Sequence, residues 1–402
     1  MRKYDVIIIG AGAAGLMCAF EAVKRGRKVC LIEHTNKVGE KIRISGGGRS
    51  NFTNLYCSPE NFLSQNPHFC KSALSRYDQH DFIALVEDHD IPYHEKAYDE
   101  KTGNENARGQ LFCDKSATDI IDMLRFGIEN LEGKFYLGTK VQDVKKTDNG
   151  FRIKTDKGPF DCESLVIASG GLSIPKIGAS NFGYELAKKF GLNIIPPRAA
   201  LVPLTFEKDL LERTKELSGV AVDASVSNDQ AAFREGLLFT HRGLSGPSIL
   251  QISSYWKEGG EIKVNLLPDI DVLGTLKKAR KEQPKKMLHT VLSDLLPGRL
   301  AILITEMSGY DDRMADLSDK KLQVVADLIA SWSVKPNGSE GYRTAEVTLG
   351  GVDTDEISSK TFEAKKADGL YFIGEVLDVT GHLGGHNFQW AWSSGWCAGQ
   401  VV

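Results

Sequence analysis

The hydrophobic pattern at the start of the chain predicts a strand, a helix and a second strand in close succession. Val6–Ile9 is a continuous apolar run, which is typical of a strand buried on both faces of a parallel sheet. A helix-like stretch follows from Leu16 to Arg25, and a second apolar strand runs from Lys28 to Ile32. We therefore expect a βαβ unit to open the fold.

Three glycines and one carboxylate give this βαβ unit a specific chemistry. Gly10, Gly12 and Gly15 follow the first strand with the spacing GxGxxG, and Glu33 ends the second strand. In dinucleotide-binding folds these glycines make a tight turn, let the backbone approach a pyrophosphate, and let helix and strand pack closely. A carboxylate at Glu33 suits free ribose hydroxyls and repels a phosphate. The motif predicts an ADP-containing dinucleotide, either FAD or NAD, against the alternative of a plain glycine-rich turn.

A second glycine-rich loop follows the second strand. Residues 39–51 contain three consecutive glycines, 46–48, and the basic residues Lys41, Arg43 and Arg49. Three glycines in succession cost conformational entropy, and backbone N–H groups beside cations are suited to an anion. We favour a ligand-binding loop over a flexible surface loop, because it lies directly after the acidic strand end.

The middle of the chain mixes helices with strands. Residues 59–131 are mostly helical in pattern, with a turn predicted at Gly109–Cys113. Alternating strands are predicted at Phe135–Leu137, Lys140–Val144 and Phe151–Thr155. The buried strand Asp161–Ala168 then runs into Ser169 and Gly170, which fits a parallel strand ending at a ligand, or a plain strand-to-loop turn.

The pattern changes at Pro196. Short strands are predicted at Leu201–Phe206, Val220–Val226, Leu237–Thr240 and Ile262–Leu266. Residues 272–332 are helical and charged, and a second break follows at Pro336. The basic run Lys277–Lys286 is interpreted as a solvated helix face, because acidic residues compensate it elsewhere and no aromatic residues are interleaved.

Near its C-terminus the chain returns to the pattern of its first domain. A buried strand ends at Gly374-Glu375, and the glycine turn Gly384–Asn387 opens a helix. In flavin enzymes of the glutathione-reductase type a late acidic strand end meets the ribitol or pyrophosphate, and a helix N-terminus stabilises negative charge on the reduced flavin. These late elements favour FAD over NAD. The sequence also lacks an evident pair of a histidine and a carboxylate, which a nicotinamide dehydrogenase would need.

Composition and charge narrow the class of protein. The chain has 402 residues, more than one core usually spans, and its hydrophobic (41%) and charged (26%) fractions are ordinary for a globular enzyme. A net charge of −3 gives no general attraction to nucleic acid or to a membrane, so neither is expected as a partner. The cysteines are scattered singly, which predicts reduced thiols, no metal site and a cytoplasmic protein.

Several longer motifs run through the chain. They are GAGAAGL at 10–16, KIRISGGGRSNFTN at 41–54, GQLFCD at 109–114, ASGGLSIPKIGASNFGY at 168–184, LLFTHRGLSGPSILQIS at 237–253, YRTAEVTLGGVDT at 342–354 and YFIGEVLDVTGHLGGHNFQWAWSSG at 371–395. In this order they resemble a bacterial flavoprotein family, the aminoacetone-oxidase-like NAD(P)/FAD-dependent oxidoreductases.

The resemblance implies an α/β fold in three parts. A discontinuous, Rossmann-like FAD-binding domain would occupy residues 1–195 and 345–402. A β-barrel-like domain would be inserted at 196–270 and 333–344, and a small helical domain at 271–332.

The resemblance also implies which residues contact FAD. The predicted set is Gly10, Gly12, Ala14, Gly15, Glu33, His34, Lys41, Gly46, Gly47, Gly48, Arg49, Asn51, Val141, Ala168, Ser169, Gly170, Gly374, Glu375, Gly384, Gly385, His386 and Asn387. Two positions depart from the family pattern. Relatives commonly have Cys where Ser50 stands and Tyr where His386 stands.

Two histidines are candidates for proton transfer. His382 and His386 flank the late glycine turn, and imidazoles beside a flavin can move protons near neutral pH. The alternative, which we favour, is that they pack or bind the cofactor, because a loop histidine is not by itself a general acid. His241-Arg242 either faces the substrate or only forms a turn.

The sequence leads to one main functional hypothesis and two alternatives. The main hypothesis is an FAD-dependent oxidoreductase that transfers hydride through flavin N5, with NADH or NADPH as a candidate electron donor. Its substrate would be a small organic molecule, undergoing reduction of a conjugated double bond or oxidation of an amine. The alternatives are a flavin-containing module that acts on RNA or a protein partner, and an NAD dehydrogenase without flavin.

Overall fold

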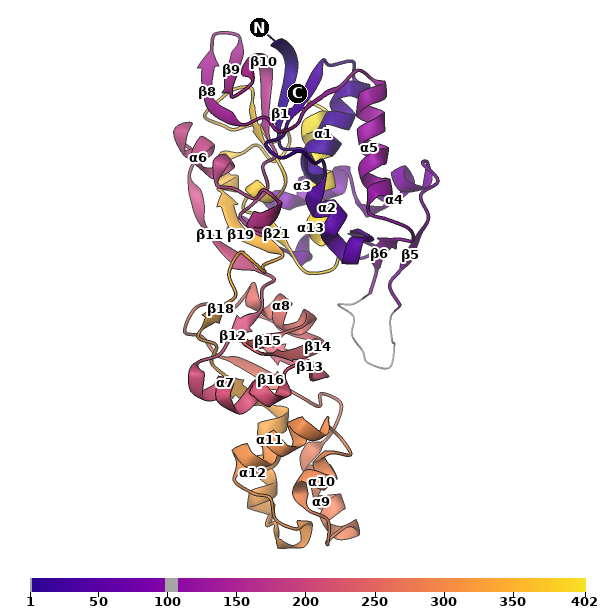
Figure 1. Cartoon of the computed structure of the whole chain (residues 1–402), viewed down its shortest axis with the longest axis vertical. Coiled ribbons are helices and arrows are strands. Elements are labelled where there is room, and N and C mark those ends of the chain that lie inside the picture. The colour runs from indigo at the N-terminus through magenta and orange to yellow at the C-terminus, as the bar shows by residue number, and fades with distance from the viewer. Residues whose placement is uncertain (1, 98–107) are drawn as a thin grey trace. The chain divides into compact units, whose positions relative to one another are not determined.

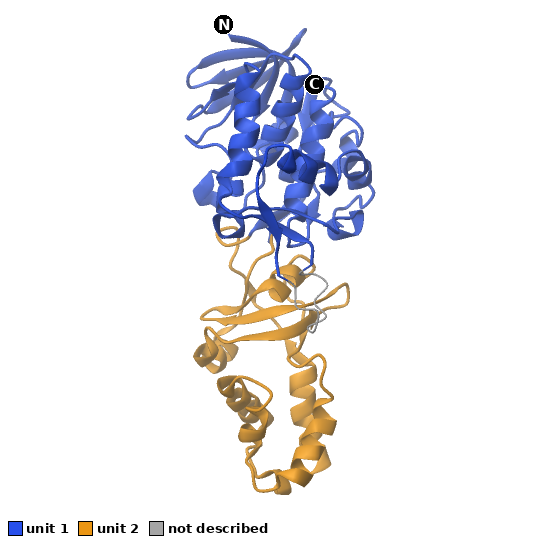
Figure 2. Cartoon of the chain, turned by 90° about the vertical axis from the view of Figure 1, so that its right-hand side faces the viewer, with its two compact units in different colours: residues 1–98, 107–199, 346–402 blue, residues 99–106, 200–345 orange. Residues whose placement is uncertain are grey.

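The computed structural model describes residues 2–97 and 108–402, which form two compact units (Figures 1 and 2). Unit 1 comprises the described parts of residues 1–98, 107–199 and 346–402, and unit 2 comprises residues 200–345. Unit 1, blue in Figure 2, is therefore assembled from both ends of the chain. Among the described residues, no helix is long and apolar enough to cross a membrane.

A mixed sheet forms the centre of unit 1, with strands in the order β7-β2-β1-β10-β9-β8 and β20 also paired with β10. Its strands are β1 (Arg2–Ile9), β2 (Val29–Ile32), β7 (Lys134–Tyr136), β8 (Val141–Thr147), β9 (Gly150–Thr155), β10 (Gly158–Ile167) and β20 (Leu370–Phe372). The pairs β7-β2, β2-β1, β1-β10 and β10-β20 are parallel, whereas β9 pairs antiparallel with both β10 and β8. These strands confirm the predicted α/β fold class.

The helices of unit 1 include α1, which contacts β1 and β2 of this sheet and packs along both α13 and α5 (Figure 1). They are α1 (Ala13–Lys24), α2 (Glu40–Ile44), α3 (Phe69–Arg76), α4 (Gln79–Glu87), α5 (Thr118–Asn130), α6 (Phe182–Lys189) and α13 (His386–Gly399). Three smaller sheets accompany them, formed by β3 (Asn51–Asn54), β6 (Gln110–Cys113) and β5 (Tyr93–Glu95), by β11 (Ile194–Ala200) and β19 (Val347–Val352), and by β21 (Thr380–Gly381) and β4 (Phe62–Leu63).

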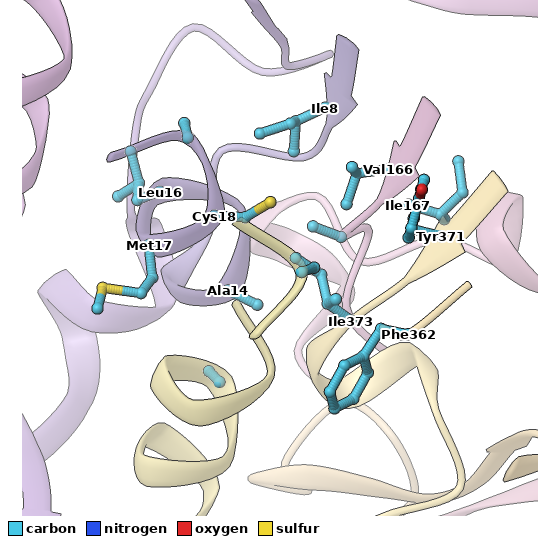
Figure 3. Close-up of a cluster of buried hydrophobic side chains, with 14 of the residues drawn as sticks. Ile8, Ala14, Leu16, Met17, Cys18, Val166, Ile167, Phe362, Tyr371 and Ile373 are labelled. Carbon is cyan, nitrogen blue, oxygen red and sulfur yellow. The ribbon is translucent and has the colours of Figure 1, made fainter. Parts of the chain in front are cut away.

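The core of unit 1 joins side chains from distant parts of the sequence. Figure 3 shows Ile8 of β1, Leu16 of α1, Val166 of β10 and Tyr371 of β20 gathered in one cluster. Ile8, Leu16 and Val166 are fully buried. Burying one such side chain contributes roughly 1.5–3 kcal/mol, so the continuous apolar runs supply much of the stability of this unit.

Unit 2 contains an antiparallel sheet in the order β17-β16-β13-β14-β15-β12-β18 together with several helices. Its strands are β12 (Leu204–Thr205), β13 (Ala221–Ser227), β14 (Ala232–Thr240), β15 (Gly243–Ser245), β16 (Ile262–Asn265), β17 (Trp332–Val334) and β18 (Gly338–Ser339), and its helices are α7 (Lys208–Thr214), α8 (Pro247–Ser253), α9 (Val272–Glu282), α10 (Leu288–Leu292), α11 (Gly298–Ser308) and α12 (Asp319–Ala330). Strands and helices share one hydrophobic core. The separate helical domain at 271–332 and the other domain boundaries stay predictions.

One local prediction was wrong. Gly109–Cys113 is not simply a turn, because β6 begins at Gln110 and pairs with β3 on one side and β5 on the other. At the predicted break, the prolines at 196 and 197 lie within β11. Proline is tolerated there because β11 and β19 form a two-stranded sheet, so each has one edge that needs no ladder hydrogen bonds.

An aromatic cluster surrounds the first residue of α13. His386 is only 5% exposed, and its ring centroid lies 6.2 Å from that of Phe62 and 6.4 Å from that of His382. Burial lowers the pKa of His386 to about 3, with a further contribution from His382, and burial lowers the pKa of His382 to about 4. Both rings are therefore neutral at neutral pH.

The burial of His386 predicts a specific loss of stability in mild acid. An unfolded histidine binds a proton below about pH 6.5, whereas folded His386 stays neutral down to a pKa of about 3. The folded state therefore loses stability as the pH falls through this window. His386→Phe should reduce the loss of unfolding free energy between pH 7 and pH 5 by about 2 kcal/mol relative to the wild type, measured by urea denaturation.

Equal losses of stability in His386→Phe and the wild type would show that His386 is not held neutral by burial.

Candidate cofactor site

Three parallel strands of unit 1 end beside one another. The N–H of Ala168 donates to the carbonyl of Ile9 (2.9 Å), and the N–H of Ile373 donates to the carbonyl of Ile167 (3.1 Å). The loops that follow these strands therefore start at the same edge of the sheet, which is where ligands bind in open α/β sheets. This arrangement brings together Gly10, Ala168, Ser169, Gly170, Gly374 and Glu375.

The glycines of the first loop have two different roles. Gly10 has a φ of +109°, and a Cβ there would lie 2.3 Å from the carbonyl oxygen of Ala168. A Cβ at Gly15 would lie 2.1 Å from the carbonyl oxygen of Gly10. Gly12, by contrast, has ordinary extended backbone, and a Cβ there would meet no atom of the described chain within 4 Å. Folding requires glycine at 10 and 15, but not at 12.

The open space beside Gly12 lies at the N-terminus of α1. Gly12 is the N-cap residue of this helix, no side chain of the described residues caps it, and its first turn contains no acidic residue. The uncapped N–H groups and the positive end of the helix dipole attract an anion. A small residue at Gly12 lets that anion approach the backbone, as the pyrophosphate of a dinucleotide would.

Glu33 is held in place as an ionised carboxylate. Its Oε2 accepts a hydrogen bond from the N–H of Ala11 (3.1 Å), and its Oε1 accepts one from the N–H of Thr35 (2.8 Å). Burial raises the pKa of Glu33, but the hydrogen bonds from His34, Thr35 and Ala11 outweigh it and lower the pKa below its usual value. A carboxylate fixed in this way is suited to accept hydrogen bonds from ribose hydroxyls.

His34 and Val141 lie near Glu33. His34 Nδ1 is 3.1 Å from Glu33 Oε1, and this hydrogen bond raises the pKa of His34 against the opposing effect of burial. The N–H of Thr139 donates to the carbonyl of Glu33 (2.9 Å), which brings the start of β8 at Val141 close by. The residues predicted to surround the adenosine half therefore converge.

The three consecutive glycines of the second glycine loop all have left-handed backbone. Gly46, Gly47 and Gly48 have φ values of +56°, +65° and +88°. A Cβ at Gly46 would lie 2.8 Å from the ring of Phe112, whereas one at Gly47 would meet no described atom within 4 Å. Ser50 also has a positive φ, +50°, and is fully buried. A strained, buried residue beside open glycines is typical of a ligand-binding loop.

A polar cluster fixes Glu375 at the end of β20. Lys41 Nζ donates to Glu375 Oε2 (2.6 Å) and to Ser173 Oγ (2.8 Å). Glu375 Oε1 accepts from the N–H of Thr348 (2.9 Å) and from Ser173 Oγ (3.2 Å). Lys41 and Glu375 were predicted, but Ser173 and Thr348 were missed. A fully buried threonine in the apolar strand β19 was the signal for the latter.

The N-terminus of α13 is a second uncapped helix end. Gly384 and Gly385 have φ values of +115° and +97°, and no side chain among the described residues caps the helix. The side chain of Asn387 closes the preceding loop by accepting from the N–H of Gly381 (2.8 Å) and donating to its carbonyl (2.9 Å). The backbone N–H groups of the first turn are thus positioned to face a ligand.

The predicted residues of this site thus lie around two helix N-termini, a fixed carboxylate and an open glycine loop. Ala14 also belongs here, because a Cβ at Gly374 would lie 2.8 Å from its Cβ. These features fit FAD, which combines a pyrophosphate, a ribose and an electron-rich ring. The assignment of individual residues to parts of FAD stays a prediction.

Comparison with curated proteins gives closely similar relatives. The chain is 52% identical to a ribosomal RNA dihydrouridine synthase of Escherichia coli (strain K12), covering 100% of this chain and 98% of the relative. It is 46% identical to a protein of the same name from Haemophilus influenzae, covering 99% and 98%. A 3-dehydro-bile acid delta(4,6)-reductase of Clostridium scindens is 28% identical over 98% of both chains.

The names of the first two relatives correct one of our predictions. We did not expect a nucleic acid among the partners, because the chain has a slightly negative net charge. Two full-length relatives named for ribosomal RNA contradict that expectation. Net charge is a poor guide here, because RNA contacts require only a local group of cations. None of the three relatives is named as an aminoacetone oxidase.

Solved structures share the fold at low identity. A 3-ketosteroid-delta4-(5alpha)-dehydrogenase from Rhodococcus jostii RHA1 has a TM-score of 0.52 at 16% identity, covering 99% of this chain and 97% of that one. A 3-ketosteroid delta1-dehydrogenase from Sterolibacterium denitrificans also has a TM-score of 0.52, at 14% identity and coverages of 100% and 99%.

A family model described as HI0933-like protein Rossmann domain matches residues 4–401. Together with the shared fold, this match confirms the predicted Rossmann-like α/β fold. The predictions of an FAD cofactor and of an oxidoreductase agree with it. The chain belongs to the HI0933-like family of Rossmann-fold proteins.

Proposed function

We propose that this protein reduces a uridine of ribosomal RNA to dihydrouridine, using FAD as its cofactor. The proposal rests on the 52% and 46% identity, over nearly the whole of both chains, to the two relatives named for this reaction. It agrees better with our alternative of a flavin-containing protein acting on RNA than with a small-molecule substrate.

The chemistry agrees with one of the two reactions predicted from the sequence. Dihydrouridine differs from uridine by two hydrogens added across the C5–C6 double bond, which is conjugated to the C4 carbonyl. The delta(4,6)-reductase relative is also named for the reduction of double bonds in a molecule that carries a ketone. When bound in reduced form, FAD would supply the hydride, and a proton would complete the addition of two hydrogens. Reduction of a conjugated double bond therefore unites these relatives, whereas amine oxidation does not.

The site residues have separate roles in this proposal. The N-terminus of α1 beside Gly12 binds the pyrophosphate, and Glu33 binds the adenosine ribose. The cluster of Lys41 and Glu375 holds the middle of the cofactor. The N-terminus of α13 faces the pyrimidine ring, where its positive dipole stabilises the negative charge of the reduced flavin.

At neutral pH, neither histidine of the late turn can act as a protonated acid. Burial keeps His386 and His382 neutral, so neither carries an imidazolium proton to donate at neutral pH. Their predicted catalytic role stays a prediction, and it is restricted to the hydrogen bonds that neutral rings make. Packing against Phe62 agrees with the alternative that they support the turn.

The glycine at position 12, which the fold does not require, most directly supports the cofactor site. Gly12→Ala should lower the flavin content of the purified protein at least tenfold, because the added methyl group would occupy the space of the pyrophosphate. The flavin-free variant should unfold within about 0.5 kcal/mol of the flavin-free wild type, since the methyl group meets no protein atom. Flavin absorbance and urea denaturation measure the two effects.

Gly15→Ala is the matched control for Gly12→Ala. Its added methyl group would meet the carbonyl of Gly10, so it should lower the unfolding free energy by about 1–3 kcal/mol even without flavin. A Gly12→Ala protein that retains flavin as well as the wild type does would exclude the pyrophosphate from this position.

The reaction itself is tested with unmodified transcripts of ribosomal RNA. The flavin-loaded protein, supplied with NADH or NADPH, should form dihydrouridine, detected by mass spectrometry as a nucleoside two hydrogens heavier than uridine. Transfer RNA and free uridine serve as controls. Oxidation of an amine, or reduction of a small conjugated ketone, without any dihydrouridine in ribosomal RNA would contradict the proposal.

A further inference from the structure

The three-stranded sheet β3-β6-β5 of unit 1 has two unlike faces. Leu111 and Cys113 of β6 are buried in the core, at 2% and 0% exposure. Side chains alternate along a strand, so Gln110 and Phe112 lie on the opposite face. His94 of β5 is the cross-strand partner of Phe112 and shares that face. One face of this sheet therefore stabilises the fold, while the other carries aromatic and amide groups.

Aromatic rings are accessible on and around this sheet. The rings of His94 and Phe112 are stacked, with centroids 6.1 Å apart and planes at 20°, and the side chain of His94 is 44% exposed. Tyr56, which follows β3, is 55% exposed, and the guanidinium of Arg108 lies 5.4 Å from its ring centroid. Exposed rings of this kind are platforms on which unpaired nucleic-acid bases stack.

Basic residues occur in the segments next to these strands. Arg49, Lys96 and Lys115 are exposed. Two backbone hydrogen bonds of 2.8 Å hold the first two of these residues against β6. The N–H of Cys113 donates to the carbonyl of Arg49, and the N–H of Lys96 donates to the carbonyl of Gln110. The neighbouring carboxylates have other partners. Glu95 accepts from the N–H of Gly109 (2.8 Å), and Asp114 lies 2.6 Å from His94 Nδ1. The cations thus remain suited to phosphates.

In the basic run of unit 2 (Lys277–Lys286), several cations have carboxylate partners. Arg280 and Lys277 form ion pairs with Asp319 at 2.6 Å and 3.2 Å, and Lys286 lies 3.4 Å from Asp294. Much of its charge is therefore compensated within unit 2. It also has no exposed aromatic ring among its own residues.

The sheet also reaches the predicted flavin end of the cofactor site. A Cβ at Gly384, in the turn before α13, would lie 3.3 Å from the side chain of Gln110. Asn54 Nδ2 donates to the carbonyl of Gly384 (2.9 Å), and Asn51 Nδ2 donates to Gln110 Oε1 (3.0 Å). RNA bound on this sheet would therefore lie next to the turn that faces the flavin ring.

We propose that these residues, here called the stacking surface (His94, Phe112, Tyr56, Arg49, Lys96 and Lys115), bind the single-stranded RNA on either side of the target uridine. The inference rests on the proposed function for the identity of the partner. Bases stack on the rings, and the cations bind the phosphates, so that one unstacked uridine is presented at the glycine turns. A duplex cannot bind in this way, because its bases are already stacked.

The test compares two double variants that remove the same charge. Binding of a single-stranded oligouridylate is measured by fluorescence anisotropy over a series of salt concentrations, using the flavin-loaded protein. Lys96→Gln/Lys115→Gln should weaken binding about tenfold at low salt and reduce the slope of log K against log salt by about 1.4, the value for two lost phosphate contacts. Lys281→Gln/Lys285→Gln, on the exposed basic run of unit 2, should bind like the wild type.

A second pair of variants separates stacking from charge. His94→Phe keeps a ring on Phe112 and should bind like the wild type, whereas His94→Ala should weaken binding at least fivefold. Equal binding by all variants, equal weakening in both lysine pairs, or equally tight binding of a duplex of the same length would overturn the stacking surface.

Failure of the stacking surface and failure of the proposed function give different results. A wild type that forms dihydrouridine, together with a Lys96→Gln/Lys115→Gln variant that binds and reacts equally well, contradicts the surface alone. A wild type that binds RNA through this surface but forms no dihydrouridine in ribosomal RNA contradicts the proposed reaction alone.

Discussion

The parallel pairing of β10 with both β1 and β20 is the interaction on which the rest of the structure depends. Leu165 of β10 is the partner of Ile7 on one side and of Leu370 on the other. This register places the end of β20 near residue 372 and the end of β1 at residue 9 on either side of the end of β10, at one edge of the sheet. Without it, the glycines of the first loop and the carboxylate of Glu375 would not share one sheet edge, and a cofactor could not contact both.

This pairing also explains why the site is built from both ends of the chain. Unit 2 is inserted between β11 and β19, so the chain leaves unit 1 and returns to it. The close contacts between α1 and α13, including a Cβ position at Gly395 only 2.6 Å from the carbonyl oxygen of Ala14, join the two ends. Both helices begin at the proposed site, so both N-termini would be available to a cofactor bound there.

The sequence was sufficient for the parts of the fold that local patterns encode. The apolar run Val6–Ile9, the spacing of Gly10, Gly12 and Gly15, and the late glycine turn predicted the opening βαβ unit and the start of α13. The small sheet β3-β6-β5 could not be predicted in this way, because Gln110–Cys113 is a strand only through its two partners. The roles of Ser173 and Thr348 likewise depend on long-range contacts with Glu375. RNA was not expected as a partner because net charge averages over the chain, whereas phosphate binding depends on a few local cations.

In the proposed reaction, electrons held on FAD in this site reduce uridine in ribosomal RNA. A single-turnover experiment tests it most directly: the flavin-loaded protein is reduced anaerobically, freed of excess donor and mixed with unmodified ribosomal RNA. The account predicts that flavin is reoxidised while one dihydrouridine forms for each flavin. A flavin that stays reduced in the presence of the RNA, or is reoxidised without any dihydrouridine, would contradict it.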